Sequence, residues 1–189
     1  QAGKKTALVS CNLRRPSLHR FFYLPLIPGM VDLFRKNCTP EDVVYSFSEV
    51  AVADSRLEPA TKLPGIENLY IITTGTVPGN PLEVLNSDYM SDLINKLRSE
   101  YDIVLIDSPP VLPVADSLVL GEKADGILLV YQLGHLPQRA LMRAKKQIQA
   151  LGIHIVGVII NNIRPEYKSV APVYISKEYM RATKNAFKE

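Results

Sequence analysis

Apolar and polar positions along this chain fall into two alternating kinds of segment. Short, nearly continuous apolar runs are separated by longer segments in which apolar residues recur every three or four positions. The first kind is typical of strands buried on both faces, and the second predicts amphipathic helices. We expect strands at 6–11, 68–74, 102–106, 126–132 and 155–161. Their alternation with helices predicts an α/β fold: a mostly parallel β-sheet with helices on both faces and right-handed crossovers.

Capping residues define the helix predictions as much as periodicity does. Asn80, Pro81 and Glu83 form a helix start, with a cap, a proline in the first turn and an acid three residues after the cap. The buried stripe of this single helix, which ends near residue 99, comprises Leu82, Leu85, Met90, Leu93 and Leu97. Further helices are expected at 30–36, 40–47, 115–123, 137–151 and 176–187. The residues around Pro16 are expected to be extended, and 51–67 to be a loop that could include an edge strand.

Composition and length indicate one globular domain over residues 1–189. Apolar residues make up 47% of the 189 positions, charged residues make up 22%, and the formal net charge is +3. This mild charge gives no indication of a nucleic-acid partner. Two cysteines cannot form a disulfide framework, which favours a reducing compartment. No apolar run is long enough to span a membrane and no signal peptide is visible, but the chain begins with Gln1 and can be a fragment.

One acid follows the most apolar of the predicted strands. Asp107 ends the run at 102–106 and is followed by Ser108 and two prolines. A carboxylate is costly to bury without a partner, so we expect it at the carboxyl edge of the sheet, where open α/β folds bind ligands. Four apolar residues, an acid, a small residue and a proline form the Walker B pattern, whose acid holds Mg²⁺. The alternative is a strand-end Asp that caps a turn.

Five segments occur in one characteristic order along the chain. They are KKTALVSCNLRRPSLHRFF, TTGTVPGNPLEVLNS, YDIVLIDSPPVLPVADSLVL, ADGILLVYQLG and GVIINNI. Together they resemble the bacterial protein-tyrosine kinases (BY-kinases) of capsule and exopolysaccharide assembly, which belong to the deviant Walker A class of P-loop NTPases. The resemblance covers residues 1–163. It implies a three-layer P-loop-NTPase-like fold, ATP and Mg²⁺ as cofactors, and tyrosine autophosphorylation.

The family's P-loop strand and helix lie just upstream of the segment that matches QAGKK, and this chain contains neither. The pattern GxxxxGK[ST] does not occur; Gly3-Lys4-Lys5-Thr6 lacks the upstream glycine and precedes a strand rather than a helix. Because the family's first strand is central in its sheet, we expect the neighbouring strands either to pair directly or to leave unpaired edges. We expect this chain to bind ATP weakly or not at all.

The resemblance also assigns candidate site residues. Asp107 matches the Walker B acid and would be the metal ligand. Ser10 and Asn12 stand where the family has two acids that lie near Mg²⁺ and the transferring phosphate, and a hydroxyl or amide has no charge to offer there. Asn161 matches an adenine contact, with a plain strand-end Asn as the alternative. Arg14 could bind phosphate, with a solvated loop arginine as the alternative.

Further expectations concern the tail and the partners. The family phosphorylates tyrosines in its C-terminal tail, and the matching tail at 164–189 contains the sparsely spaced candidates Tyr167, Tyr174 and Tyr179. The family's setting implies a homo-oligomer at the inner face of the plasma membrane. Its partner there would be a membrane polysaccharide co-polymerase or transport protein, or the chain's own upstream membrane domain.

Three functions remain open from the sequence. The first is the tyrosine kinase domain of a polysaccharide assembly system. The second is a catalytically degenerate regulatory or docking domain of such a system, which the replacements at Ser10 and Asn12 favour. The third and weakest is a partitioning-type ATPase, against which the Arg-Arg-Pro-Ser and Asn-Pro-x-Glu segments speak.

Overall fold

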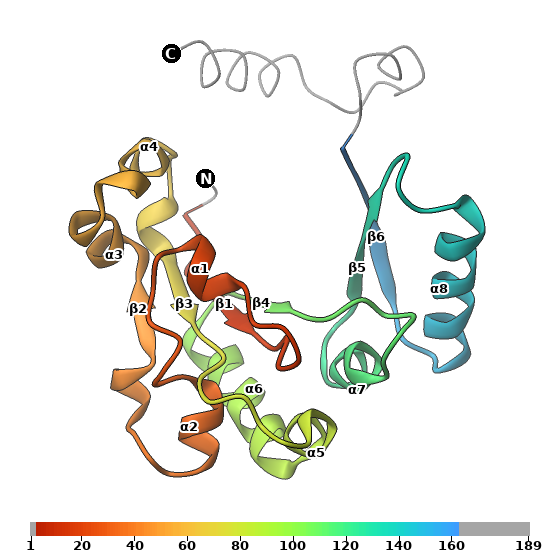
Figure 1. Cartoon of the computed structure of the whole chain (residues 1–189), viewed down its shortest axis with the longest axis horizontal. Helices are drawn as coiled ribbons and strands as arrows, with labels where there is room; N and C mark the ends of the chain where they lie inside the picture. The colour runs from red at the N-terminus through yellow and green to blue at the C-terminus, as the bar shows by residue number, and fades with distance from the viewer. Residues whose placement is uncertain (1–2, 163–189) are drawn as a thin grey trace.

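The structure, a computed structural model, describes residues 3–162 and contains two β-sheets (Figure 1). The first has the strand order β2-β3-β1-β4, formed by β2 (Val44–Ser46), β3 (Leu69–Ile72), β1 (Thr6–Ser10) and β4 (Ile103–Asp107). In it β1 is parallel to β3 and β4, while β2 is an antiparallel edge strand. The second sheet pairs β5 (Ile127–Gln132) with β6 (Ile155–Asn161) in parallel. The predicted α/β fold with a mostly parallel sheet is confirmed.

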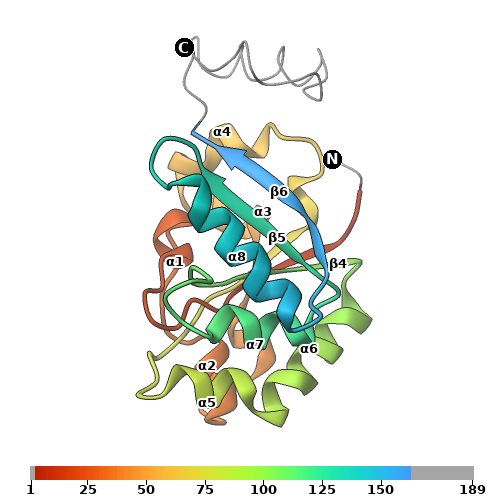
Figure 2. The ribbon, with the colours of Figure 1, turned by 90° about the vertical axis from the view of Figure 1, so that its right-hand side faces the viewer.

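Helices connect the strands and cover the sheets. They are α1 (Leu18–Phe21), α2 (Met30–Phe34), α3 (Phe47–Ala53), α4 (Glu58–Thr61), α5 (Pro81–Asn86), α6 (Asp88–Glu100), α7 (Asp116–Lys123) and α8 (Gln138–Ala150), with 3-10 turns η1 (Pro40–Asp42), η2 (Ser55–Leu57) and η3 (Ile66–Asn68). Figure 2 shows α8 lying across one face of the β5–β6 pair. Every helix within residues 3–162 is too short or too polar to cross a bilayer.

The core consists of three apolar clusters, one on each face of the first sheet and one on the second sheet. On one face, Val9 of β1 and Val104 of β4 pack with α2, α5, α6 and α7. On the other, Ile71 of β3 packs with α1, α3 and α4. The third cluster joins α7 and α8 to Ile127 and Leu129 of β5. Because α7 contributes Leu120 to the first cluster and Leu118 to the third, it bridges the two sheets.

The predicted helix at 40–47 and loop at 51–67 are wrong. Pro40–Asp42 is a single 3-10 turn, and the chain then forms β2, because Val44 and Tyr45 favour a strand and pair with β3. The edge strand expected within residues 51–67 therefore lies earlier in the chain, at Val44–Ser46. Residues 51–67 contain the end of α3, then α4 and two 3-10 turns.

Two other local predictions need correction. The expected single helix at 80–99 is two helices, because the backbone at Ser87 is extended and its hydroxyl caps α6 by accepting from the Met90 N–H. Leu82, assigned to the buried stripe, is exposed. The expected extended segment after Pro16 includes the short helix α1. The helix predicted at 176–187 lies outside the described residues.

Candidate functional site

The strands β1 and β4 end side by side and place Asp107 at the carboxyl rim of the first sheet. Ser10 is the register partner of Asp107, and the Cys11 N–H donates to the Asp107 carbonyl at 2.8 Å. Side chains of paired residues in neighbouring parallel strands point to the same face, so residues 10 and 107 share one face of the rim. This is the edge at which the sequence predicted Asp107.

Asp107 is half-buried, and within residues 3–162 it takes part in no ion pair. Burial removes water from its carboxylate and raises the pKa of Asp107 above the ordinary 3.8. Desolvation first, and the Asp107 charge second, raise the pKa of the buried Cys11 thiol above its ordinary value. A cation at this rim would stabilise the ionised form of Asp107.

A single carboxylate fits one mode of Mg²⁺ binding. Mg²⁺ commonly takes one or two carboxylates and completes its coordination with water and substrate phosphates. Across the described residues, no three His, Cys, Asp or Glu side chains converge as a metal cage. Asp107 can therefore hold Mg²⁺ that arrives with a nucleotide, and is a poor site for a free ion.

Ser10 is buried and its hydroxyl is engaged with Thr74. The Thr74 hydroxyl donates to the Ser10 carbonyl at 3.1 Å, and the two hydroxyl oxygens lie 2.8 Å apart. Because each hydroxyl has one proton, the Ser10 hydroxyl must be the donor in the second bond. The Ser10 proton is thus committed within the protein.

A clamp that the sequence analysis missed holds Thr74 in place. The carboxylate of the buried Asp32 accepts from the N–H groups of Gly29 and Thr76, at 2.9 and 3.0 Å. The Val31 N–H donates to the Thr74 carbonyl at 2.9 Å. A Cβ on Gly29 would collide with the Gly75 backbone, so this close approach requires glycine. The run Thr-Thr-Gly-Thr directly after a strand was the available signal.

Asn12 and Arg14 also have partners inside the protein. The Asn12 side-chain oxygen accepts from the Arg15 N–H at 3.2 Å. Arg14 forms a two-bond fork with the fully buried Asp116 at 2.8 and 2.9 Å, which raises the pKa of Arg14. This fork ties the loop after β1 to α7, while the Arg14 side chain remains partly exposed.

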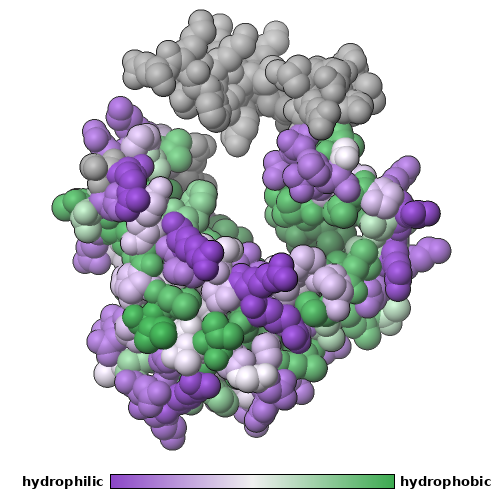
Figure 3. Space-filling view, in the orientation of Figure 1, coloured by the Kyte–Doolittle hydropathy of each residue, from purple (hydrophilic) through white to green (hydrophobic). Residues whose placement is uncertain are grey.

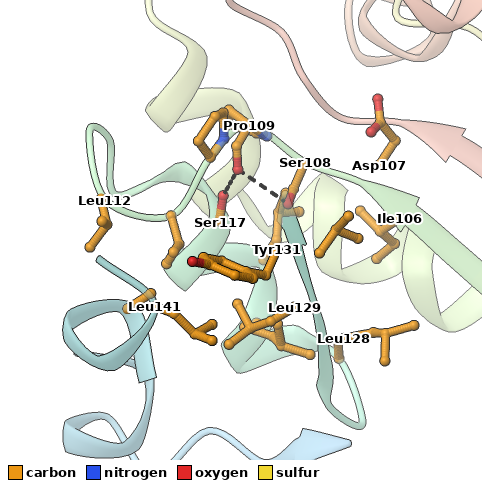
Figure 4. A pocket seen from close by; sticks show the side chains of 18 of the residues that line it. Ile106, Asp107, Ser108, Pro109, Leu112, Ser117, Leu128, Leu129, Tyr131 and Leu141 are labelled. Carbon is orange, nitrogen blue, oxygen red and sulfur yellow. Dashed lines mark hydrogen bonds between the residues drawn. The ribbon is translucent and has the colours of Figure 1, made fainter. Parts of the chain in front are cut away.

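Asp107 and Asn161 line one cleft of about 730 Å³ between β4 and β5. Figure 4 shows Asp107 at one end of this cleft, away from Leu128 and Leu129. Asn161 is the register partner of Gln132 at the end of the second sheet, and its side-chain oxygen accepts from the Asn162 N–H at 2.8 Å. Both residues thus border one cleft, although their strands belong to different sheets.

The loop after Asp107 is anchored by Ser117, which the sequence analysis also missed. The Ser117 hydroxyl donates to the Pro109 carbonyl from the first turn of α7 (Figure 4). Its position next to Asp116 at the start of a predicted helix was the only signal. Tyr167, Tyr174 and Tyr179 lie outside the described residues.

Known proteins resemble this chain in both sequence and structure, although no family model matches it. The tyrosine-protein kinase YwqD of Bacillus subtilis is 30% identical over 178 residues, which cover 94% of this chain and 68% of YwqD. This chain belongs to the bacterial tyrosine-protein kinase family. The putative tyrosine-protein kinase EpsB of Ralstonia solanacearum is 34% identical over 163 residues, or 86% of this chain and only 20% of EpsB.

The structural comparison agrees with this assignment. The solved kinase domain of VpsO superposes with a TM-score of 0.72 and 31% identity, over 85% of this chain and 71% of that chain. Because this chain belongs to the tyrosine-kinase family, the edge of the sheet that carries Asp107 is the candidate site for nucleotide chemistry.

Proposed function

We propose that this chain is a catalytically degenerate tyrosine-kinase-family domain that regulates or docks on a membrane polysaccharide-assembly system. The observation that carries the proposal is the state of Ser10 and Asn12. Both are uncharged, and both use their side chains in hydrogen bonds within the protein. The domain would work at the inner face of the plasma membrane, as a homo-oligomer beside a polysaccharide co-polymerase.

Tyrosine phosphorylation needs a group that removes the phenolic proton as phosphate transfers. A positioned carboxylate can take this proton, and such general-base assistance contributes roughly 10²–10⁴-fold to the rate. Neither the Ser10 hydroxyl nor the Asn12 amide has a basic atom, and both are engaged in hydrogen bonds within the protein. Residues 10 and 12 therefore cannot act as this base.

The remaining chemistry of the rim is electrostatic. Asp107 would hold the Mg²⁺ of a bound nucleotide, whose charge offsets both the phosphates and the desolvated carboxylate. Asn161, which also lines the cleft, would face the base of the nucleotide. Arg14 contributes indirectly, because its bonds to Asp116 fix the loop beside the rim.

An autophosphorylation assay on the complete gene product tests the proposal. The variants are wild type, Ser10→Asp/Asn12→Asp, and the same double variant with Asp107→Ala, each incubated with ATP and Mg²⁺ and blotted for phosphotyrosine. We expect the double variant to exceed wild type by about 10²-fold, because it regains acids beside Asp107. Adding Asp107→Ala should remove that gain.

Strong phosphotyrosine formation by the wild type, lost in Asp107→Ala, would show an active kinase and refute the degenerate assignment. A double variant no more active than wild type would show that the missing acids are not the cause of inactivity. Mass spectrometry of the double variant would also show whether Tyr167, Tyr174 or Tyr179 accepts phosphate.

A further inference from the structure

The basic residues of the second sheet and its helix have no acidic counterparts nearby in the sequence. Residues 3–125 contain sixteen aspartates and glutamates against twelve lysines and arginines, whereas residues 126–162 contain four lysines and arginines and no acid. All four lie on α8, at Arg139, Arg143, Lys145 and Lys146. The part of the structure formed by β5, β6 and α8 is therefore positively charged, next to a remainder with more acids than bases.

Helical spacing gathers three of these charges on the outer face of α8. Ala144 and Ile148 are buried on its inner face. Arg139, Arg143 and Lys146 are exposed and recur three or four positions apart on the opposite face, and we call them the basic row. Figures 1 and 2 show α8 on the outside of the molecule, and Figure 3 shows hydrophilic surface along this edge. The basic row therefore points away from the other described elements.

An apolar side chain lies among these cations. Together with Gln138 and Met142, the basic row borders a shallow depression on the surface of α8. Met142 is 47% exposed, although an apolar side chain normally gains from burial. Basic residues around an exposed apolar residue are typical of a helix that lies on a membrane, with its cations at the phosphate headgroups and its apolar group deeper. The guanidinium fork of arginine also suits phosphate oxygens.

The basic row does not stabilise the helix that carries it. Within residues 3–162 none of its members takes part in an ion pair. Arg139 lies in the first turn of α8, which contains no acid, and Arg143 follows four positions later. A cation near a helix N-terminus and like charges at this spacing both disfavour the helix. In α6 the order is the favourable one, with Asp88 in the first turn and Arg98 in the last. A partner outside the described protein accounts for the basic row better than helix stability does.

We propose that the outer face of α8 docks on the anionic phospholipid headgroups of a membrane through Arg139, Arg143 and Lys146. Nucleic acid fits this face less well, because the face has no aromatic side chain on which a base could stack. Met142 adds an apolar contact that the acyl boundary of a membrane accepts and a phosphate backbone does not. The location at a membrane rests on the proposed function. Docking by α8 would turn the more acidic part of the domain away from the negative lipid surface.

Co-sedimentation of the 189-residue chain with lipid vesicles tests this docking. The vesicles consist of phosphatidylcholine alone or of phosphatidylcholine with about 30% phosphatidylglycerol, which makes their surface anionic. We expect binding to the anionic vesicles only, and its loss in about 0.5 M salt, where surface charges are strongly screened. Arg143→Gln/Lys146→Gln should weaken binding by about tenfold or more, because each basic residue near an anionic surface contributes roughly fivefold.

Matched variants locate the binding. Arg35→Gln/Lys62→Gln removes one arginine and one lysine from exposed positions outside α8 and should bind like wild type. The swap Arg143→Lys/Lys146→Arg keeps both charges and should also bind.

Several results would overturn the proposal. One is equal binding by wild type and Arg143→Gln/Lys146→Gln, as when residues 163–189 carry all the binding. Others are equal losses in the two charge-removing variants, or binding to a short DNA duplex in about 0.15 M salt without binding to anionic vesicles. Because no nucleotide is used, failure of lipid docking would leave the degenerate-kinase assignment untouched, and phosphotyrosine formation by wild type would leave lipid docking untouched.

Discussion

At the scale of single residues, the rim is defined by one carboxylate without an opposite charge. Asp107 has lost part of its water, and within residues 3–162 it forms no ion pair. Its neighbour Ser10, in contrast, has a neutral partner in Thr74. A desolvated and uncompensated carboxylate stores unfavourable energy that a bound cation can relieve, which is how binding sites differ from purely structural ones.

The raised pKa of Asp107 predicts a specific pH dependence. Since the folded state holds this proton more tightly than the unfolded state, Asp107 contributes stability below the ordinary pKa of 3.8 and loses it as pH rises through the raised pKa. Asp107→Asn should therefore be more stable than wild type at neutral pH without divalent ions, and the difference should shrink towards about pH 4. Urea unfolding in EDTA at the two pH values measures this.

The control for this prediction is Asp102→Asn, at an exposed carboxylate that precedes the same strand. It should not reproduce the gain at neutral pH. A destabilised Asp107→Asn at neutral pH would mean that Asp107 has a stabilising partner in the folded protein.

At the scale of elements, local capping competes with periodicity. The apolar spacing from residue 82 to 97 is compatible with one helix, yet the chain turns at Ser87 between α5 and α6. The Ser87 hydroxyl donates to the Val84 carbonyl at 2.7 Å and accepts from the Met90 N–H at 3.2 Å, so it ends one helix and starts the next. The break allows both Leu85 of α5 and Met90 of α6 to reach the first core cluster.

Removal of this cap should have a measurable cost. Ser87→Ala deletes an N-cap acceptor, and we expect it to lower the free energy of unfolding by about 1 kcal/mol. Ser99→Ala, near the end of α6, removes only an exposed hydroxyl that donates to the Lys96 carbonyl, and should change stability by less than about 0.5 kcal/mol. Chemical denaturation of both variants gives the comparison, and equal effects would argue against the capping role.

At the scale of the whole molecule, the two sheets differ in how well they are supported. In the four-stranded sheet β1 has a strand on each side and apolar clusters on both faces. The β5–β6 pair has one apolar cluster, formed with α7 and α8, and exposes Val130, Val156 and Ile160. An isolated pair of strands is marginally stable, so this sheet depends on its helices.

This asymmetry predicts two levels of hydrogen-exchange protection in the 189-residue chain. Amides of β1 and β3 should exchange by global unfolding, whereas those of β5 and β6 should exchange faster through local opening. Native-state exchange at increasing urea concentration separates these classes. A single shared opening free energy for both sheets would contradict the prediction.

The sequence by itself determined the features that depend on local patterns. The five apolar runs appear as parallel strands, and the change from apolar residues to Asp107 and two prolines places that acid at a strand end. Asn80 caps α5 as expected, with the Glu83 N–H donating to it. These predictions succeed because burial on both faces and helix capping depend on residues close together in the chain.

Only the tertiary structure decided which strands and side chains pair with one another. The segment 40–46 became a turn and an edge strand because β3 offered a free edge, which local propensity does not reveal. Thr74 lies 64 positions from Ser10, and Asp116 lies 102 positions from Arg14, so no spacing rule could connect them. Whether an acid, hydroxyl or guanidinium is free for chemistry depends on such distant groups.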